Sequence, residues 1–469
     1  MKKTKIICSI GPASYDKDVM REMIKSGMNV CRVNFSHATL EERHTVEEDV
    51  RYFNEEEGCN IGLLYDTKGP DLRTCDFKDG IITLKNGESI RILKEPVLGT
   101  SEAISFNHPE VIDNINVGDN VLIEDGLLRL EVTDKDEKGL TCKIFAGGTI
   151  KSRRGVNVPG VDLGMKFINE VDEEDIKYAC EHKGDFLSAS FVSTAQNVRD
   201  LRALLEKYGR PEMKIISKIE TQTGIENIDE IIDLSDGIMV ARGDLGVEVP
   251  MEKLPTYQKM IVKKCREKSK ICVVATEMLA SMYTAARPTR AEVSDIANAV
   301  LDGCDAVMLS GDTTMGAYPI QAVRYMATIA NEAEKNYDYS HKFNYDDEND
   351  VTEAMSRAVI DCANSLSAKA IVTATISGYT ACKISNLKPQ TVIVAPCVNK
   401  DVAHSLALNY GVYPVLDKKF DTIDEVIESA VESTQEMLGL VPGDTLVITG
   451  GFPATKEKTT NFMKVEVIK

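Results

Sequence analysis

Short apolar runs alternate with amphipathic segments over the first 70 residues of the chain. Strands are expected at Thr4–Ile10, Asn29–Phe35 and Ile61–Tyr65, and helices at Asp16–Ser26 and Thr39–Glu56. Short apolar strands separated by helices are typical of βαβ units. The N-terminal pattern therefore predicts a parallel sheet.

The pattern changes after Lys68-Gly69-Pro70, where hairpin signals replace helical ones. Ile82–Ile92 alternates around Asn86-Gly87, the strongest short hairpin signal, and Val121–Val132 alternates in the same way around Asp125-Gly126. Two more strands are expected within Leu128–Ile150. Because no helical periodicity occurs between residues 81 and 158, we expect a small antiparallel β domain inserted after the third strand.

The alternation of helix and strand resumes near Val171, where a helix is expected through His182. Five further apolar runs are expected to be strands: Asp185–Ser190, Lys214–Ile219, Gly237–Ala241, Ile271–Ala275 and Asp305–Leu309. Together with the first three strands they make eight, the number that closes a (β/α)8 TIM barrel.

A third unit is expected beyond the acidic, Asn-rich stretch Asn344–Asp350, where the alternation starts afresh. Its strands are expected at Lys369–Thr375, Thr391–Ala395, Val412–Leu416, Thr445–Thr449 and Phe462–Ile468. The predicted fold class is therefore α/β, with three parts. A TIM barrel covers residues 1–69 and 169–343, an inserted antiparallel β-barrel lid covers 70–168, and a three-layer α/β domain covers 344–469.

Length and composition agree with several domains. The 469 residues exceed the ~250–300 that one core usually organises, and 43% hydrophobic and 28% charged residues are ordinary for a globular protein. No apolar run approaches the ~18–20 residues of a membrane span, and the start leads directly into the first strand, with no room for a signal peptide. We therefore expect a cytoplasmic protein.

Cysteine spacing and net charge narrow the function classes further. No C-x-x-C pair occurs among the twelve cysteines, which favours buried thiols in a reducing cytosol over a redox or metal role. The formal net charge of −19 argues against nucleic acid or an anionic membrane as a partner. If the substrate is anionic, positive charge must be gathered locally, from a few basic side chains and bound cations.

Polar residues follow the expected barrel strands, at the rim where TIM-barrel enzymes carry their catalytic groups. In chain order these groups are Arg32, Asn34, Ser36, Asp66, Thr67, Lys68, Lys218, Glu220, Arg242, Asp244, Thr276, Glu277 and Asp312. A single charged residue after a strand is usually a solvated loop residue. Polar groups that follow several strands and lie at one rim predict a functional site. Arginine, lysine and carboxylates together suit a phosphorylated anion bound through a hard divalent cation, which prefers oxygen ligands.

Lys218 and Glu220 are two residues apart in an otherwise apolar strand, so they project to the same side. Two interpretations follow from this spacing. The pair belongs to a catalytic site, or it forms a salt bridge that fills the barrel interior.

Five motifs, in order along the whole chain, resemble the pyruvate kinase family. They are Met28–His37 (MNVCRVNFSH), Asp66–Thr74 (DTKGPDLRT), Ile215–Glu220 (IISKIE), Gly237–Pro250 (GIMVARGDLGVEVP) and Arg287–Gly311 (RPTRAEVSDIANAVLDGCDAVMLSG). The resemblance also includes Arg154–Gly160 (RGVNVPG). It implies a glycolytic enzyme that transfers the phosphoryl group of phosphoenolpyruvate to ADP, giving pyruvate and ATP through a metal-stabilised enolpyruvate.

The resemblance implies roles for the matching residues around the reaction centre. Arg32 and Lys218 match residues that face the transferring phosphoryl group, and Gly243, Asp244 and Thr276 match further substrate contacts. The enolate would take its proton near Thr276. Positive charge would stabilise the transfer, and the β domain would act as a lid that excludes water.

The resemblance also implies cation and nucleotide sites. Glu220 and Asp244 match the ligands of Mg²⁺ or Mn²⁺, and Asn34, Ser36, Asp66 and Thr67 match those of K⁺. The nucleotide-side residues are Asn34, Ser36, His37, Arg73 and Arg154. The family implies a homotetramer.

The chain departs from the family pattern at five positions near these sites. Asp71 stands where potassium-dependent members usually carry Glu, Arg154 replaces a usual Lys, and Glu277 a usual Gln. Thr221 replaces a usual Asn and Asp312 a usual Glu. Asp71 keeps the charge of Glu but is shorter, so we expect the K⁺ requirement to persist with weaker cation affinity.

A hydroxyl-rich loop follows the first strand of the C-terminal unit. Its residues Thr375, Ser377, Gly378, Tyr379 and Thr380 lead into a helix, a pattern typical of a phosphate nest or of an ordinary capped turn. The family resemblance favours a regulatory site for a phosphosugar effector. Cys382, in place of a frequent Arg, and Lys458, in place of a usual Gly, argue against it.

Two other functional classes are compatible with a barrel of this kind. Another barrel that handles phosphoenolpyruvate or pyruvate, such as an aldolase or a mutase, would need neither the inserted β domain nor the Arg32–His37 motif. A non-catalytic binding protein would be expected to have lost Lys218, Glu220 or Asp244, and all three are present.

Overall fold

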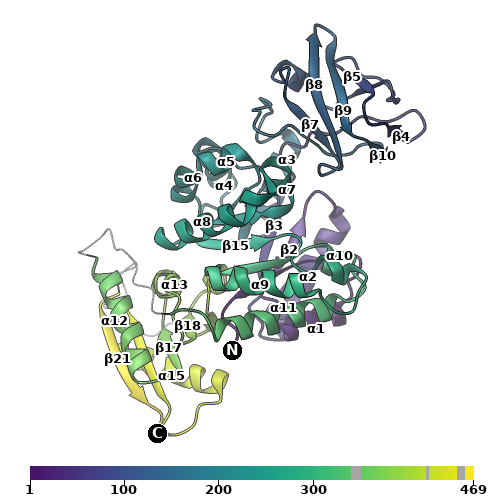
Figure 1. Ribbon diagram of the computed structural model, residues 1–469. Coiled ribbons are helices and arrows are strands. Elements are labelled where there is room, and N and C mark those ends of the chain that lie inside the picture. Colours follow the sequence, from purple (N-terminus) through teal and green to yellow (C-terminus); the bar gives the residue numbers. More distant parts are fainter. Residues whose placement is uncertain (340–349, 419–421, 452–459) are drawn as a thin grey trace.

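The computed structural model describes residues 1–339, 350–418, 422–451 and 460–469, without the side chain of Ile423. Figure 1 shows a barrel at the centre, a β domain at one end and a second α/β unit, in light green and yellow, at the other. None of the helices in these ranges has both the length and the apolar character that crossing a bilayer requires.

Eight parallel strands close into the predicted barrel, in the order β1-β16-β15-β14-β13-β12-β3-β2. They are β1 (Lys5–Ser9), β2 (Val30–Asn34), β3 (Gly62–Asp66), β12 (Phe186–Ala189), β13 (Lys214–Ile219), β14 (Gly237–Ala241), β15 (Ile271–Ala275) and β16 (Ala306–Leu309). Most strand positions are buried, because helices cover the outside and side chains fill the inside. The eight predicted barrel strands are confirmed.

The helices that connect these strands or follow the last one surround the barrel. They are α1 (Lys17–Ser26), α2 (Leu40–Glu56), α3 (Glu170–Glu181), α4 (Ala195–Lys207), α5 (Gln222–Glu226), α6 (Ile228–Leu234), α7 (Arg242–Glu248), α8 (Leu254–Glu267), α9 (Arg290–Asp302), α10 (Gly311–Thr314) and α11 (Pro319–Glu334). Helices α2 and α3 begin with capping boxes, Thr39 with Glu42 and Asn169 with Asp172.

The β domain leaves the barrel after β3 and returns before α3, as predicted. Its strands are β4 (Ile81–Leu84), β5 (Ser89–Leu93), β6 (Ala103–Ser105), β7 (Asn120–Ile123), β8 (Leu128–Asp136), β9 (Gly139–Ala146), β10 (Gly148–Lys151) and β11 (Val156–Asn157). They form a two-stranded sheet, β10-β4, and a six-stranded sheet, β11-β7-β8-β9-β5-β6. All pairs are antiparallel except β5 with β6.

One of the two predicted hairpins is wrong. The turn at Asp125-Gly126 joins the paired strands β7 and β8, but β4 and β5, on either side of Asn86-Gly87, belong to different sheets. Gly87 does adopt the expected positive φ, and the amide of Gly147 donates to Asn86 Oδ1 at 2.6 Å. The turn therefore forms as predicted, but each flanking strand finds a partner distant in sequence.

The C-terminal unit is a five-stranded sheet in the order β19-β18-β17-β20-β21, parallel except for β21. Its elements are α12 (Val351–Ser365), β17 (Ala370–Thr373), α13 (Tyr379–Asn386), β18 (Ile393–Cys397), α14 (Lys400–Ser405), β19 (Val412–Leu416), α15 (Ile423–Leu438), β20 (Thr445–Gly450) and β21 (Phe462–Val467). One face of the sheet packs with α12, α13 and α14, and the other with α15. These are the three predicted layers.

The C-terminal unit closes the end of the barrel where the strands begin. Ala407 and Leu408 belong to the same apolar cluster as interior residues of the barrel, and Ala407 lies beside Gly62 and Phe186, the first residues of β3 and β12. Lys388 also forms a buried ion pair with Asp305, at 2.5 Å. The predicted domain boundaries at 69/70 and 168/169 stay predictions, and the one at 343/344 lies outside the described residues.

Candidate active site

Four charged side chains meet inside the barrel at the ends of β2, β3 and β13. Arg32 Nε donates to Asp66 Oδ2 at 2.7 Å, and Lys218 Nζ lies 3.1 Å from Asp66 Oδ1 and 3.0 Å from Glu220 Oε1. Asp244, in the first turn of α7, adds a third carboxylate beside Glu220. We call Arg32, Asp66, Lys218, Glu220 and Asp244 the rim cluster.

Burial and charge pairing have opposite effects on Asp66 and Lys218, and charge pairing prevails at both. Asp66 and Glu220 are each 1% exposed. Burial alone would raise the pKa of Asp66, but Arg32 and Lys218 hold it below its ordinary value. Burial would likewise lower the pKa of Lys218, and the charges of Asp66 and Glu220 reverse this effect and raise it. The Lys218–Asp66 pair is therefore fully ionised at neutral pH.

The two remaining carboxylates, Glu220 and Asp244, are less well compensated by positive charge than Asp66. Burial raises the pKa of Glu220 to about 7, Lys218 opposes the rise and Asp244 adds to it. Burial also raises the pKa of Asp244. The Phe191 amide donates to Glu220 Oε2 at 2.6 Å, from a residue with φ of 57°. Two adjacent buried carboxylates with raised pKa values indicate a place suited to a cation.

Thr276 and Gly243 meet at the ends of β15 and β14. The Gly243 amide donates to Thr276 Oγ1 at 2.7 Å, and the Thr276 hydroxyl donates to the Ala275 carbonyl at 2.6 Å. Thr276 and Glu277 both have positive φ, 69° and 55°, which is costly for residues with a Cβ. Arg242 donates to the Thr276 carbonyl at 2.8 Å and so supports this strained turn. The side chain of Glu277 is exposed.

The four predicted K⁺ ligands lie on two neighbouring strand ends. Asn34 pairs in register with Asp66, and its Oδ1 accepts from the Ser36 amide at 3.0 Å. Thr67 is buried, and its Oγ1 accepts from the Ser190 amide at 3.2 Å. Ser36 follows β2 in a turn and is exposed, so it does not continue the strand face of Arg32 and Asn34.

A cleft of about 600 Å³ lies between the β domain and the barrel. Its lining includes Asp71, Arg73 and Arg154 from the β-domain side and Asp244 from the rim cluster. Asp71 Oδ2 accepts from Arg73 Nε at 2.5 Å and lies 3.5 Å from Lys68 Nζ. Asn34, Ser36 and His37 are not part of this lining, and Ser36 and His37 lie in an exposed turn. The structure thus places the two arginines in one cleft, and the other predicted nucleotide residues lie outside its lining.

Three residues of the site were not singled out from the sequence. Ser190, after β12, accepts from Lys218 Nζ at 2.8 Å and donates to the Thr67 carbonyl at 2.7 Å. Ser9, at the end of β1, accepts from Arg32 Nη1 at 2.7 Å, and Phe191 caps Glu220. Ser190 ends a predicted strand and Ser9 is the last residue but one of another, so the rule used for the other strand ends would have found them. The Phe191 amide leaves no signal in the sequence.

Asp312 and the C-terminal loop make none of the rim-cluster contacts given above. Asp312 is buried at the start of the short α10, and burial raises its pKa to about 6. In the loop before α13, Thr375 Oγ1 accepts from the Gly378 amide at 2.8 Å, and Thr380 and Thr460 hydroxyls are 2.8 Å apart. Lys458 lies outside the described residues.

Two family models match the chain. The pyruvate kinase barrel domain matches residues 1–323, and the pyruvate kinase alpha/beta domain matches residues 353–466. Among curated proteins, a pyruvate kinase of Bacillus licheniformis is 42% identical over 473 residues, covering 100% of this chain and 81% of the other. A pyruvate kinase of Clostridium perfringens (strain 13 / Type A) is 40% identical, with 100% of both chains covered.

A solved structure extends the similarity to three dimensions. The crystal structure of a pyruvate kinase from Cryptosporidium parvum superimposes with a TM-score of 0.93 at 35% identity. The match covers 100% of this chain and 96% of the other.

Proposed function

The chain belongs to the pyruvate kinase family, and from this premise we propose that the rim cluster is where its reaction takes place. The activity of the family, EC 2.7.1.40, transfers the phosphoryl group of phosphoenolpyruvate to ADP and gives pyruvate and ATP. The single observation that carries the placement is the buried network of Arg32, Asp66, Lys218 and Glu220 at one end of the barrel.

A divalent cation fits Glu220 and Asp244. Members of the family generally need a divalent metal ion and K⁺. Here the two carboxylates lie side by side in a buried place, and burial raises both pKa values, which is the expected behaviour of hard oxygen ligands that lack their cation. We propose these residues as the ligands of Mg²⁺ or Mn²⁺. When bound, the ion would supply positive charge for the substrate oxygens.

The proposed K⁺ ligands are Asn34, Ser36, Asp66 and Thr67. They offer amide, hydroxyl and carboxylate oxygens on adjacent strand ends, which is the donor set that a weakly hydrated monovalent ion accepts. Asp66 is already shared by Arg32 and Lys218. A single further positive charge therefore suits this position better than a divalent ion.

Arg32 and Lys218 bind and orient the phosphoryl group in the proposed mechanism. Both cations are oriented by hydrogen bonds within the protein. Arg32 donates to Ser9 and Asp66, and Lys218 donates to Asp66 and Ser190. Because these contacts fix both cations before substrate arrives, little reorganisation is needed as charge develops. The Lys218 ammonium then stabilises the negative charge left on the three-carbon product.

Gly243 and Thr276 bind the substrate carboxylate in this proposal, and the proton of the enolate arrives on the Thr276 side. The Gly243 amide here donates to Thr276 Oγ1, and the Thr276 hydroxyl donates to the Ala275 carbonyl. Substrate binding would exchange these contacts for contacts to the carboxylate. The strained φ of Thr276 keeps the hydroxyl at this position.

The cleft beneath the β domain is the proposed nucleotide side. Arg73 and Arg154 supply cationic groups for phosphates from the lid, and the proposal adds Asn34, Ser36 and His37 from the barrel rim. Since these two sets lie apart in the structure, nucleotide binding would involve movement of the lid toward the barrel, which also excludes water.

Three broader features remain proposals. We propose a homotetramer and a phosphosugar effector at Thr375, Ser377, Gly378, Tyr379 and Thr380, supported by membership of the family and by the Thr375–Gly378 contact. We also propose a cytoplasmic location. All twelve cysteines lie in the described ranges as free thiols, which is in keeping with a reducing compartment.

A coupled assay with phosphoenolpyruvate and ADP tests the placement of the divalent site. Wild type should turn over only with Mg²⁺ or Mn²⁺, and Asp244→Asn should need a much higher ion concentration for half-maximal rate. Glu252→Gln, an exposed carboxylate just beyond α7, is the matched control and should behave as wild type. An unchanged metal requirement in Asp244→Asn would contradict the assignment.

A further inference from the structure

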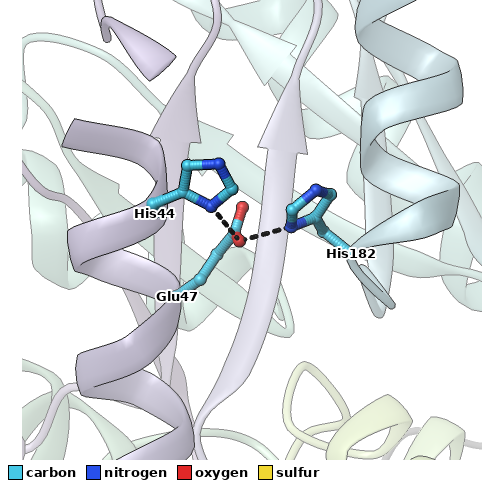
Figure 2. Close-up of side chains that lie close together, drawn as sticks. All are labelled: His44, Glu47 and His182. Carbon is cyan, nitrogen blue, oxygen red and sulfur yellow. Dashed lines mark hydrogen bonds and ion pairs between the residues drawn. The ribbon is translucent and has the colours of Figure 1, made fainter. Parts of the chain in front are cut away.

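Two histidines and a glutamate gather on the outer wall of the barrel, away from the rim cluster. His44 and Glu47 lie three residues apart on α2, and His182 caps the C-terminal end of α3 (Figure 2). One ligand atom from each of the three lies within 4.8 Å of the others. We propose that His44, Glu47 and His182 form a binding site for a transition-metal ion of the Zn²⁺ class, separate from the catalytic cations.

The distances between the atoms suit a tetrahedral ion. His182 Nδ1 lies 2.7 Å from Glu47 Oε2, and His44 Nδ1 lies 3.6 Å from the same oxygen. Zinc bonds of ~2.0–2.1 Å at tetrahedral angles place ligand atoms roughly 3.3 Å apart. The two observed distances bracket this value, so small side-chain rotations would bring all three atoms around one ion.

The ligand types select the metal. Two imidazole nitrogens with one carboxylate are typical of zinc and related transition metals, whereas Mg²⁺ and Ca²⁺ prefer oxygen donors throughout. Binding at both Nδ1 atoms requires the neutral imidazoles to carry their protons on Nε2. The proton between His182 Nδ1 and Glu47 is then displaced to Nε2 or released to solvent.

Two of the ligands are held in place by the protein. Tyr65 donates to Glu47 Oε1 at 2.5 Å, which leaves Oε2 directed toward the histidines. The ring of His182 stacks on Tyr178, with centroids 4.0 Å apart and planes 10° from parallel. Such outer contacts orient metal ligands and adjust their affinity. The side chain of His44 is 54% exposed and its ring lies beside that of His182, with centroids 5.0 Å apart, so the solvent side of the cluster can supply a water as fourth ligand.

The position of the site gives the ion a structural consequence. It would join α2 to α3, beside the ion pair of Arg43 with Asp175 that already links these helices at 2.8 Å. Helix α2 follows the turn that carries Ser36 and His37, and the α3 residue Asp172 accepts from the Gly69 amide at 2.9 Å, where the chain leaves for the β domain. A bound ion therefore restrains the two segments that flank the catalytic rim.

The test measures Zn²⁺ retained per chain by the full-length protein, after dialysis against a large excess of Mg²⁺ that occupies the catalytic divalent site. Wild type should keep one Zn²⁺ and gain several degrees in thermal midpoint. His44→Ala and His182→Ala should bind at least ~100-fold more weakly and lose the midpoint gain, because each removes a direct ligand. His44 is exposed, so its replacement should leave the midpoint without zinc unchanged.

A matched control and a spectroscopic measurement separate this site from other zinc-binding groups. His108 forms a similar exposed pair with Glu110, at 2.9 Å, and is not part of a three-residue cluster in the described chain, so His108→Ala should bind as wild type. Co²⁺ in place of Zn²⁺ should show the visible bands of a four-coordinate site without thiolate charge transfer. Failure of wild type to retain Zn²⁺, equal retention by His44→Ala, or a thiolate spectrum would each overturn the proposal.

Discussion

Replacing Lys218 with Met removes a cation that Asp66 and Glu220 share. Its Nζ lies 3.1 Å from Asp66 Oδ1, 3.0 Å from Glu220 Oε1 and 2.8 Å from Ser190 Oγ. Methionine fills much of the same space without the charge. Asp66 keeps Arg32 after the change, whereas Glu220 is left with the Phe191 amide and the neighbouring carboxylate of Asp244 among the contacts described above.

The expected magnitudes follow from this geometry. One ammonium–carboxylate attraction at 3.0 Å amounts to about 5.5 kcal/mol at an effective dielectric constant of about 20. Loss of one partner from a buried ion pair typically costs about 3–5 kcal/mol of folding stability, because a buried charge is left uncompensated. Loss of a preorganised charge at a phosphoryl-transfer site should also lower kcat by ~10²–10³ or more.

The assay combines turnover of phosphoenolpyruvate and ADP with urea unfolding of the same preparations. Lys214→Met is the matched control, because Lys214 begins the same strand and contacts the Ser405 carbonyl at the opposite end of the barrel, at 2.6 Å. It should keep nearly the wild-type kcat. A folded Lys218→Met variant with kcat within about tenfold of wild type would refute Lys218 as the main electrostatic group.

Three further predictions concern cations, regulation and pH. At constant ionic strength, K⁺ should strongly activate wild type and Asp71→Glu but hardly affect Asp71→Lys, which supplies its own cation; equal wild-type activity with and without K⁺ would contradict this. Calorimetry should detect binding of a phosphosugar, such as fructose 1,6-bisphosphate, and this binding should disappear in the Thr375→Ala/Ser377→Ala double variant. If wild type binds none of fructose 1,6-bisphosphate, glucose 6-phosphate, ribose 5-phosphate and AMP, the loop has a structural role only. Burial raises the pKa of Asp185 to about 7 in the folded protein, against ~3.9 in the unfolded chain. The protonated group therefore favours folding below pH ~4. This contribution to the free energy of unfolding, up to roughly 4 kcal/mol, is lost as the pH rises to about 7. Urea midpoints of Asp185→Asn should lack this pH dependence relative to wild type, and identical profiles would disprove the role.

The barrel was predictable because its signal is local. Each buried strand is a short apolar run bounded by a helix, and eight such runs can close in essentially one way. The β domain was harder, because Asn86-Gly87 specifies a turn but not the strands that pair beside it. Pairing of β4 with β10 and of β5 with β9 depends on contacts across about 50 residues or more, which no short pattern records.

The rim cluster shows the same division between local and distant information. The shared side of Lys218 and Glu220 follows from their spacing on one strand, and the structure confirms their contact. The shift in the pKa of Glu220 needs burial and the approach of Asp244 from the first turn of α7. In the His44, Glu47 and His182 site, the proximity of His44 and Glu47 follows from their spacing of three residues on a helix. The position of His182 depends on how α3 packs against α2, which the sequence pattern does not specify.

The contact of Ala407 and Leu408 with the barrel interior has a consequence for the order of events during synthesis. These residues leave the ribosome roughly a hundred positions after the last barrel strand, β16. Domains generally fold as units while the chain emerges, the N-terminal one first. Here the nascent barrel exposes an apolar opening until the C-terminal unit arrives, so a pause or truncation in that interval produces an aggregation-prone chain and not a working catalytic fragment.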